Sequence, residues 1–244
     1  MSAPARSGGT DGTNRKKLAF GLVMLIGIGI TTALGLWQLD RRDWKLALIA
    51  RVTERVDRAP APVPGPAEWP GVTAAGYEYR HVTMTGRFLN DRETLVQAVT
   101  ALGGGFWVLT PFRTDQGFTV LVNRGFVPSD RRDPATRPAG QIEGDTRVAG
   151  LLRISEPGGG FLRDNDPAAG RWYSRDVAAI AKARDLAGSA PFFVDADARP
   201  NDGGWPKGGM TVLQFRNSHL GYALTWFGLA AMLAAALAVI LRGR

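Results

Sequence analysis

Two long apolar runs stand near opposite ends of the chain, and shorter alternating patterns fill the sequence between them. The first run, LAFGLVMLIGIGITTALGLWQL, covers residues 18–39, and the second lies within residues 218–241 as LGYALTWFGLAAMLAAALAVIL. Neither run contains a charged residue. A helix of about 22 residues, rising ~1.5 Å per residue, crosses the ~30 Å core of a bilayer. Both runs therefore predict transmembrane helices.

The residues beside the two runs predict their orientation. A basic segment, RKK, precedes the first run, as it would in a signal peptide, but the run is longer than a signal-peptide core and passes Trp37 without a cleavage motif. A retained anchor is therefore favoured. The second run is followed by RGR, and basic flanks remain in the cytoplasm. We expect residues 1–17 to form a disordered cytoplasmic tail, 242–244 a second cytoplasmic tail, and 40–217 an extracytoplasmic domain.

Between the spans the apolar period changes from helical to two. Residues 40–58 keep helical spacing and extend the first span, whereas the prolines at positions 60, 62, 64 and 66 make residues 59–70 an extended connector. In YEYRHVTMTGRFL, Val82, Met84 and Phe88 alternate with polar residues, which predicts a strand with one buried face. Further strands are expected in TLVQAV, FWVLTPF, FTVLVNRGF, TRVAGLLR, PFFVDA and MTVLQF, which begin at residues 94, 106, 118, 146, 191 and 210.

One helix is expected among these strands, in SRDVAAIAKARDLAG, with Ser174 as its N-cap and Gly188 at its C-terminal end. Its Ala, Val and Ile stripe would pack on the sheet. The fold class expected is membrane α+β: a two-helix transmembrane hairpin carrying an extracytoplasmic, mostly antiparallel β domain with one packed helix, and with a small closed barrel as a possible form.

Composition narrows the classes of function. The formal charge is +8, but the arginines are scattered among Asp and Glu without a dense basic run, so nucleic acid is not expected as a partner. Membrane lipid, acidic proteins or ligand carboxylates suit such arginines better. Cysteine is absent from the sequence, which excludes disulfides, thiolate metal sites and covalent haem attachment.

Catalytic chemistry finds little support in the sequence. The only histidines are His81 and His219, and no zinc-protease, nucleophile-elbow or P-loop motif is present. His81 belongs to the polar face of a strand, where an exposed or hydrogen-bonded side chain is expected. The paired acids Asp195 and Asp197 lack the spacing of a calcium site. The chain is therefore predicted not to be an enzyme.

The ends of the spans carry more information. Trp37 and Arg41 lie one helical turn apart, which suits either an aromatic belt or a cation–π pair that braces the hairpin. His219, Tyr222 and Trp226 follow at i, i+3 and i+7 on one expected face of the second span. A neutral imidazole there can hydrogen-bond or can ligate haem iron, with the apolar face covering the macrocycle and arginines pairing with the propionates.

Small residues also repeat along both spans. Gly27, Thr31 and Gly35 recur every four residues in the first, and Thr225 and Gly228 begin a similar stripe in the second. Such stripes allow two helices to pack closely, either within the hairpin or against another membrane protein.

Several motifs resemble those of the surfeit-locus protein 1 (Surf/Shy) family of cytochrome c oxidase assembly factors. The main ones are LGLWQLDRRDWKLALI, LVNRGFVP and NSHLGYALTWFGLA, which begin at residues 34, 121 and 217, supported by GFWVLTPF and TGRFL. The likeness extends from about residue 18 to 241, and the two spans around a large domain agree with it. Members of the family often have Trp after N-R-G, where this chain has Phe126.

The resemblance implies a role in building the haem–copper centre of oxidase subunit I, with haem a bound as transient cargo. It implies His219 as the axial ligand of haem iron, with Tyr222 and Trp226 beside it. The W-Q-x-x-R element, which falls on Trp37, Gln38 and Arg41, and the N-R-G element, which falls on Asn123, Arg124 and Gly125, are implied as cofactor-binding, partner or structural motifs. The expected partners are oxidase subunit I, the haem a synthase and membrane lipid.

From the residues alone, Asn123, Arg124 and Gly125 suit a strand-ending turn that needs glycine, or a site where Arg124 meets an acidic partner or a haem propionate at the membrane surface. Two other functions stay open: a haem-free scaffold that stabilises nascent subunit I, and an extracytoplasmic ligand sensor. The N-terminal segment contains Asp11 and no Arg-rich amphipathic pattern, which favours a bacterial inner membrane over a mitochondrial one.

Overall fold

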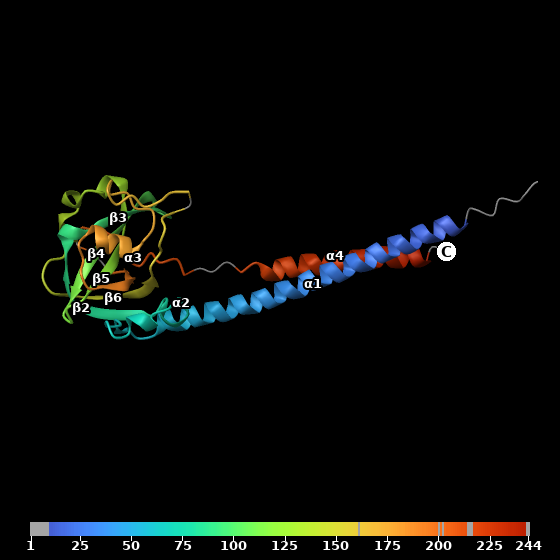
Figure 1. Ribbon diagram of the computed structural model, residues 1–244, viewed down its shortest axis with the longest axis horizontal. Helices are drawn as coiled ribbons and strands as arrows, with labels where there is room; N and C mark the ends of the chain where they lie inside the picture. The colour runs from blue at the N-terminus through green and yellow to red at the C-terminus, as the bar shows by residue number, and fades with distance from the viewer. Residues whose placement is uncertain (1–9, 161, 200, 202, 214–216, 243–244) are drawn as a thin grey trace, which may run out of the picture. The chain divides into compact units, whose positions relative to one another are not determined.

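The computed structural model describes residues 10–160, 162–199, 201, 203–213 and 217–242. The chain divides into two compact units. A helical unit combines the N-terminal residues through Arg51 with those from 214 onwards, and a barrel unit covers Val52–Leu213 (Figure 1).

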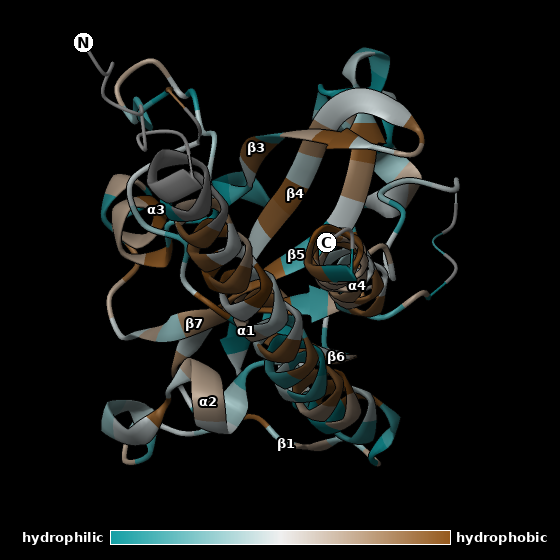
Figure 2. Cartoon of the chain, turned by 90° about the vertical axis from the view of Figure 1, so that its right-hand side faces the viewer, coloured by the Kyte–Doolittle hydropathy of each residue, from teal (hydrophilic) through white to brown (hydrophobic). Residues whose placement is uncertain are grey.

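The helical unit is built from helix α1 (Thr10–Asp57) and helix α4 (His219–Arg242). Both meet the requirements of a membrane span in length and composition, over Leu18–Asp57 and His219–Arg242, and apolar residues line both helices in Figure 2. The chain is therefore a membrane protein with two candidate spans.

Helix α1 corrects one expectation. The span and its predicted extension form one continuous helix, but residues 10–17, expected to be disordered, are helical as well. No proline interrupts this segment, and adding residues to a helix that the apolar run has already nucleated costs little. Residues 1–9 of the predicted tail lie outside the described residues.

Helices α1 and α4 pack against each other in antiparallel order. A Cβ added to Gly27 would lie 3.2 Å from Leu233, and one added to Gly35 would lie 2.5 Å from the ring of Phe227. The expected small-residue contact on α1 is thus confirmed. On α4 it is wrong: an added Cβ on Gly228 would meet no described atom within 4 Å. Phe227 and Leu233 of α4 fill the space that the glycines of α1 leave, and the small residues buried on α4 are Ala223 and Ala230.

The barrel unit contains seven strands and several short helices. In chain order these are β1 (Ala61–Pro62), η1 (Trp69–Gly71), α2 (Ala74–Tyr77), β2 (His81–Phe88), η2 (Asn90–Arg92), β3 (Thr94–Thr100), β4 (Gly103–Thr114), β5 (Thr119–Pro128), η3 (Ser129–Arg131), η4 (Pro134–Thr136), η5 (Pro138–Gly140), β6 (Thr146–Ile154), α3 (Val177–Ala183) and β7 (Ser189–Ala196).

The sheet closes on itself. Its strand order is β1-β2-β6-β7-β5-β4-β3, and an additional pairing of β2 with β4 completes a ring of five strands. Pairing within the ring is antiparallel except between β5 and β7, which are parallel. The expected small barrel is confirmed, and closure leaves no open edge between its strands.

Alternation along the strands separates two hydrophobic clusters. One cluster contains Val82 and Met84 of β2 with Phe112, Val122 and Phe192 from other strands of the ring. In the second cluster, helix α3 packs against the sheet, as its apolar stripe predicted. Its members are Val96, Leu109, Leu121, Trp172, Val177, Ile180 and Phe193.

Three local predictions are corrected in the barrel unit. The segment MTVLQF forms no strand over Met210–Leu213, and its last two residues lie outside the described ones. Helix α3 is capped by Asp176, whose side chain accepts a hydrogen bond from the Ala179 amide, and not by Ser174. Ala61–Pro62, inside the proline-rich connector, forms the short strand β1, because extended backbone can pair with β2 between prolines.

Candidate functional site

His219, the first residue of α4, makes a hydrogen bond to α1. Its Nδ1 lies 2.7 Å from Oε1 of Gln38. The two residues are far apart in sequence, but the antiparallel packing of the helices brings the W-Q-x-x-R element and the head of α4 together at one end of the helix pair.

This bond fixes the tautomer of the imidazole. An amide oxygen can only accept a hydrogen bond, so Nδ1 of His219 must carry the ring proton and donate a hydrogen bond to Oε1 of Gln38. In a neutral ring, Nε2 then keeps its lone pair. Iron- and zinc-ligating histidines have this arrangement, in which the second nitrogen donates to a carbonyl or carboxylate that orients the ring.

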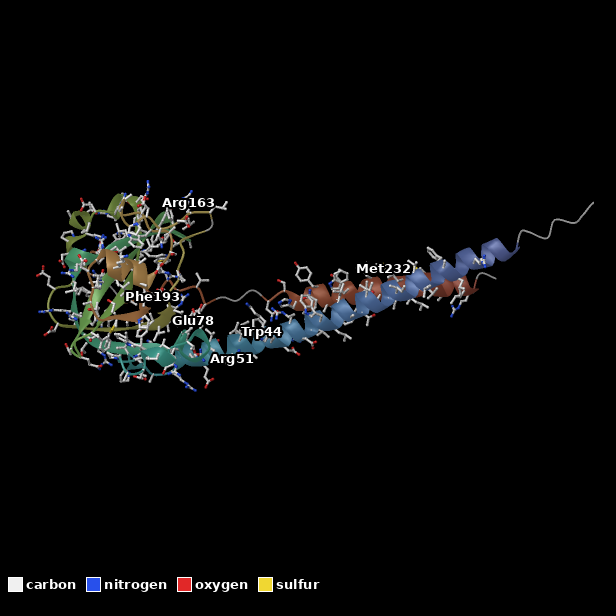
Figure 3. The ribbon with its side chains drawn as sticks, viewed as in Figure 1. Trp44, Arg51, Glu78, Arg163, Phe193 and Met232 are labelled. Carbon is white, nitrogen blue, oxygen red and sulfur yellow. The ribbon has the colours of Figure 1, made fainter. Side chains whose placement is uncertain are left out.

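The other residues predicted at this end of the helix pair differ in their exposure and in their contacts. Trp37 and Tyr222 are exposed, at 52% and 59%, and Trp226 is half-buried. The guanidinium of Arg41 lies 4.6 Å from the ring centre of Trp44, so the cation–π pair expected between Arg41 and Trp37 forms with Trp44 instead. Figure 3 labels Trp44 on α1. Among the described residues, the structure thus provides an imidazole whose Nε2 has no hydrogen-bond partner, exposed aromatic rings on both helices, and the exposed cation of Arg41.

The N-R-G element lies in the barrel unit and is not a strand-ending turn. Strand β5 continues through it to Pro128, and the pairing of β5 with β4 shifts register between Trp107 and Leu109. Asn123 pairs with Leu109 and Phe126 with Trp107, so β5 has one residue more than β4 here, which defines a β-bulge.

Gly125 is required by this bulge. Its φ is +127°, and a Cβ at this position would lie 1.9 Å from the carbonyl oxygen of Lys207. Lys207 crosses β5 at the next residue, where its amide and carbonyl exchange hydrogen bonds with Phe126. The glycine therefore allows the chain after β7 to pass directly over the bulge.

The bulge leads to a first prediction. Gly125→Ala is expected to destabilise the protein by at least about 3 kcal/mol, because the new Cβ meets backbone and cannot be accommodated by a rotamer change. Thermal unfolding of the full chain in detergent measures this. Gly104→Ala is the matched control: a Cβ there meets nothing within 4 Å among the described residues. Equal melting temperatures for the two variants would contradict the prediction.

Asn123 belongs to a buried polar network around Asp195, which is 4% exposed. Nδ2 of Asn123 donates to Oδ1 of Asp195 over 2.7 Å, and Oδ1 of Asn123 accepts from the Gly125 amide over 3.1 Å. Arg153 and Arg175 donate to the same carboxylate at 2.9 and 3.3 Å. Four side chains thus fix Asp195, the fourth being Thr211. Burial opposes the charge of Arg153, but Asp195 and its neighbours outweigh that effect and raise the pKa of Arg153.

Arg124 is buried, at 4% exposure, and does not reach a surface. Its Nη2 donates to the carbonyl of Gly140, and its Cζ lies 4.7 Å from the ring centre of Phe88. Burial lowers the pKa of Arg124 to about 10. The hypothesis that Arg124 meets a partner at the membrane surface therefore does not fit its position inside the barrel unit.

The remaining candidates have structural partners. Nε2 of His81 lies 2.8 Å from Asp197, and its Nδ1 lies 3.1 Å from the carbonyl of Arg58, so the prediction of a hydrogen-bonded histidine is confirmed. Asp195 and Asp197 face different partners, and no cluster of three metal-ligating residues occurs in the described part of the chain.

Sequence patterns missed Glu93, whose carboxylate is buried against Arg137, because a single charge beside a strand gives no sign of burial.

Together these features define a membrane-anchored protein: a pair of apolar helices joined by an imidazole–amide hydrogen bond, carrying a five-stranded barrel. The family model described as the SURF1 family matches residues 25–231. Surfeit locus protein 1 of Homo sapiens is 37% identical over 227 residues, which cover 85% of this chain and 73% of the human protein.

Two further relatives agree. Surfeit locus protein 1 of Mus musculus is 40% identical over 215 residues, covering 81% of this chain and 68% of the mouse protein. A SURF1-like protein of Monosiga brevicollis is 38% identical over 217 residues, covering 83% of this chain and 80% of that protein. The chain belongs to the SURF1 family, which is known as a family of cytochrome oxidase assembly factors. The predicted family is thus confirmed.

Proposed function

We propose that this protein assists the assembly of a haem–copper cytochrome oxidase by binding haem a and supporting its insertion into, or its protection in, subunit I. Family membership supports the assembly role. The observation that carries the haem proposal is the hydrogen bond between His219 and Gln38, which leaves Nε2 of a neutral imidazole able to ligate iron.

The residues beside His219 suit such a cargo. Haem a has a large apolar macrocycle and two propionates, and the exposed rings of Trp37 and Tyr222 offer apolar surface at the same end of the helix pair. Arg41 is exposed and offers a cation for a propionate. In this proposal His219 ligates the iron, Gln38 orients the imidazole, and Trp37, Tyr222 and Trp226 cover the ring. Haem a synthase and subunit I are then the proposed donor and acceptor.

A titration tests the proposal. Full-length protein is purified in detergent from cells that make no haem a and is then titrated with haem a. We expect a saturable shift of the Soret band with one haem bound per chain. Folded protein that leaves the spectrum of free haem a unchanged would overturn the haem proposal.

The scaffold remains a second candidate, because the bond between Gln38 and His219 also ties α1 to α4 and so can stabilise the helix pair for contacts with subunit I. Deleting the gene in cells that synthesise subunit I normally should abolish oxidase assembly under both proposals. Restoration of assembly by a variant that cannot bind haem a would favour the scaffold.

We also propose a bacterial inner membrane as the location, with both termini cytoplasmic and the barrel unit periplasmic. The basic residues that flank the spans support this orientation, although the named relatives are eukaryotic. Because the chain has no cysteine, single cysteines report topology directly. In intact cells, Ser7→Cys should resist a membrane-impermeant maleimide and Ala101→Cys should react; the reverse pattern would refute the orientation.

A further inference from the structure

A second candidate site lies entirely within the barrel unit. A cavity of about 370 Å³ is lined by Val148 and Ala149 of β6, by Asp197 and Arg199 after β7, and by Arg124 of the bulge. This volume falls within the range of ~300–1,000 Å³ typical of small-molecule sites. The cavity is separate from the proposed haem site, and among its lining residues Arg124 belongs to the N-R-G element.

Arg124 is the distinctive residue of the lining. Its Nη2 is bonded to the carbonyl of Gly140, but its buried Nη1 has no hydrogen-bond partner among the described residues. Arginine is always protonated near neutral pH, and a buried guanidinium normally pairs with an anion. Glu93 favours the charged form of Arg124 from a distance, but Arg137 already occupies both carboxylate oxygens of Glu93. Arg124 therefore lacks an anion of its own.

Two further unpaired atoms lie beside the segment that Arg124 contacts. Asn90 donates to the carbonyl of Ile142 over 2.9 Å, yet its buried Oδ1 has no partner within the described chain. Nε2 of Gln141, between Gly140 and Ile142, is also buried and unpaired there. Ile142 itself lines the cavity. Two unpaired donors, Nη1 of Arg124 and Nε2 of Gln141, thus lie near one end of the cavity, and a ligand acceptor can satisfy the donor of Arg124.

The charge of the lining favours a single negative charge. Arg147 and Arg199 line the cavity with Arg124, and Asp197 is the one acidic residue in the lining. Asp197 is 2.8 Å from His81, and Arg199 donates to the carbonyl of Arg147 over 2.9 Å. Arg147 and Arg199 are exposed, so water screens their charges, whereas Arg124 is a buried cation that a single carboxylate can neutralise. Val148, Ala149 and the ring of Phe88 provide an apolar wall for the rest of the ligand.

We propose that this cavity binds a small monocarboxylate with an apolar body, with the carboxylate paired to Arg124 and the body against β6. The proposal does not depend on haem binding, because every residue involved belongs to the barrel unit. It assigns Arg124 a ligand-binding role in addition to its place in the bulge.

Calorimetric titration of the full chain in detergent tests the proposal, with hexanoate and benzoate as probes. Hexanol and benzyl alcohol are the neutral counterparts of the same shape, and inorganic phosphate is the multiply charged one. We expect saturable binding of at least one carboxylate, with the matching alcohol and phosphate at least about tenfold weaker. Absence of saturable carboxylate binding, or equal binding of the alcohol, would overturn the proposal.

Variants assign the binding to the cavity. Arg124→Met keeps an unbranched apolar stem and removes the guanidinium charge, so carboxylate affinity should fall at least about tenfold. Ala149→Leu places a larger side chain in the cavity and leaves Arg124 unchanged, so it should weaken carboxylate binding. This variant keeps the site testable if Arg124→Met does not fold. Arg113→Met, at an exposed position of β4 outside the cavity, should bind as the parent does. Undiminished binding in either cavity variant would place the ligand elsewhere and refute the site.

Discussion

Replacing His219 with asparagine is expected to abolish saturable haem a binding while preserving the helix pair. The Nδ2 of asparagine occupies nearly the position of Nδ1 of histidine, so the 2.7 Å bond to Gln38 can persist. Asparagine has no counterpart of Nε2, and the proposed iron ligand is lost. Loss of a group that only orients a metal ligand costs about 10- to 100-fold in affinity. Loss of the ligand itself should cost more, so the affinity for haem a is expected to fall at least about a hundredfold. The Soret titration described above measures it.

Variants of Gln38 test the orienting role separately. Gln38→Leu should weaken haem a binding by about 10- to 100-fold, because the imidazole loses the acceptor that fixes its tautomer. Gln38→Glu keeps an acceptor at the same place and should retain binding. Thr225→Ala, at an exposed position of α4, is the matched control and should leave the spectrum unchanged.

The same variants distinguish a ligand from a brace. If His219 only holds α1 to α4, His219→Asn should behave like the parent in oxidase assembly, and Gln38→Leu should be the more damaging change. If His219 ligates iron, the order is reversed. Haem a binding by His219→Asn with parental affinity would exclude His219 as the ligand.

The helices and most strands follow from local patterns, which explains why the sequence predicts them. Charge-free runs long enough to span a bilayer have few other stable structures. In β2, Val82 and Met84 are buried and the residues between them are not, as a period of two requires. β1 was missed because Ala61–Pro62 is too short to show a period. MTVLQF was wrongly predicted as a strand: its alternation is present, but the described part of the segment is held by other contacts, such as the hydrogen bond from Thr211 to Asp195.

The candidate sites depend on contacts between distant residues, which local patterns do not contain. Gln38 could be recognised as part of a motif, but its bond to His219 depends on the antiparallel register of α1 and α4. Similarly, N-R-G reads as a turn, because glycine after a strand usually ends it. Only the crossing of Lys207 over Gly125 explains why the glycine lies within β5. The burial of Arg124 is a consequence of the same bulge.

Glu93→Gln is expected to be among the most destabilising single substitutions in the barrel unit. The side chains of Glu93 and Arg137 are 4% and 2% exposed, and they form two hydrogen bonds, with Nη1 of Arg137 3.1 Å from Oε2 of Glu93. Breaking a buried ion pair by removing one partner costs about 3–5 kcal/mol, because the remaining charge stays buried without compensation. Here the cost is enhanced, since Glu93 also offsets the charge of Arg124.

Thermal unfolding of the full chain in detergent should show a fall in Tm of roughly 6–20 °C for Glu93→Gln, given ~2–4 °C per kcal/mol for a domain of this size. Glu54→Gln is the matched control, because it breaks the exposed pair between Glu54 and Arg58 and such pairs contribute only about 0–1 kcal/mol.

The double variant Glu93→Leu with Arg137→Met separates two explanations of this effect. If the cost of Glu93→Gln arises from an uncompensated buried charge, removing both charges should restore part of the lost stability, even though the bond from Arg137 to the carbonyl of Arg131 is lost as well. If the pair matters mainly through its own hydrogen bonds, the double variant should be no more stable than the single one. Arg124 loses the carboxylate of Glu93 in both variants, so the difference between the two melting temperatures reports the uncompensated charge of Arg137 itself.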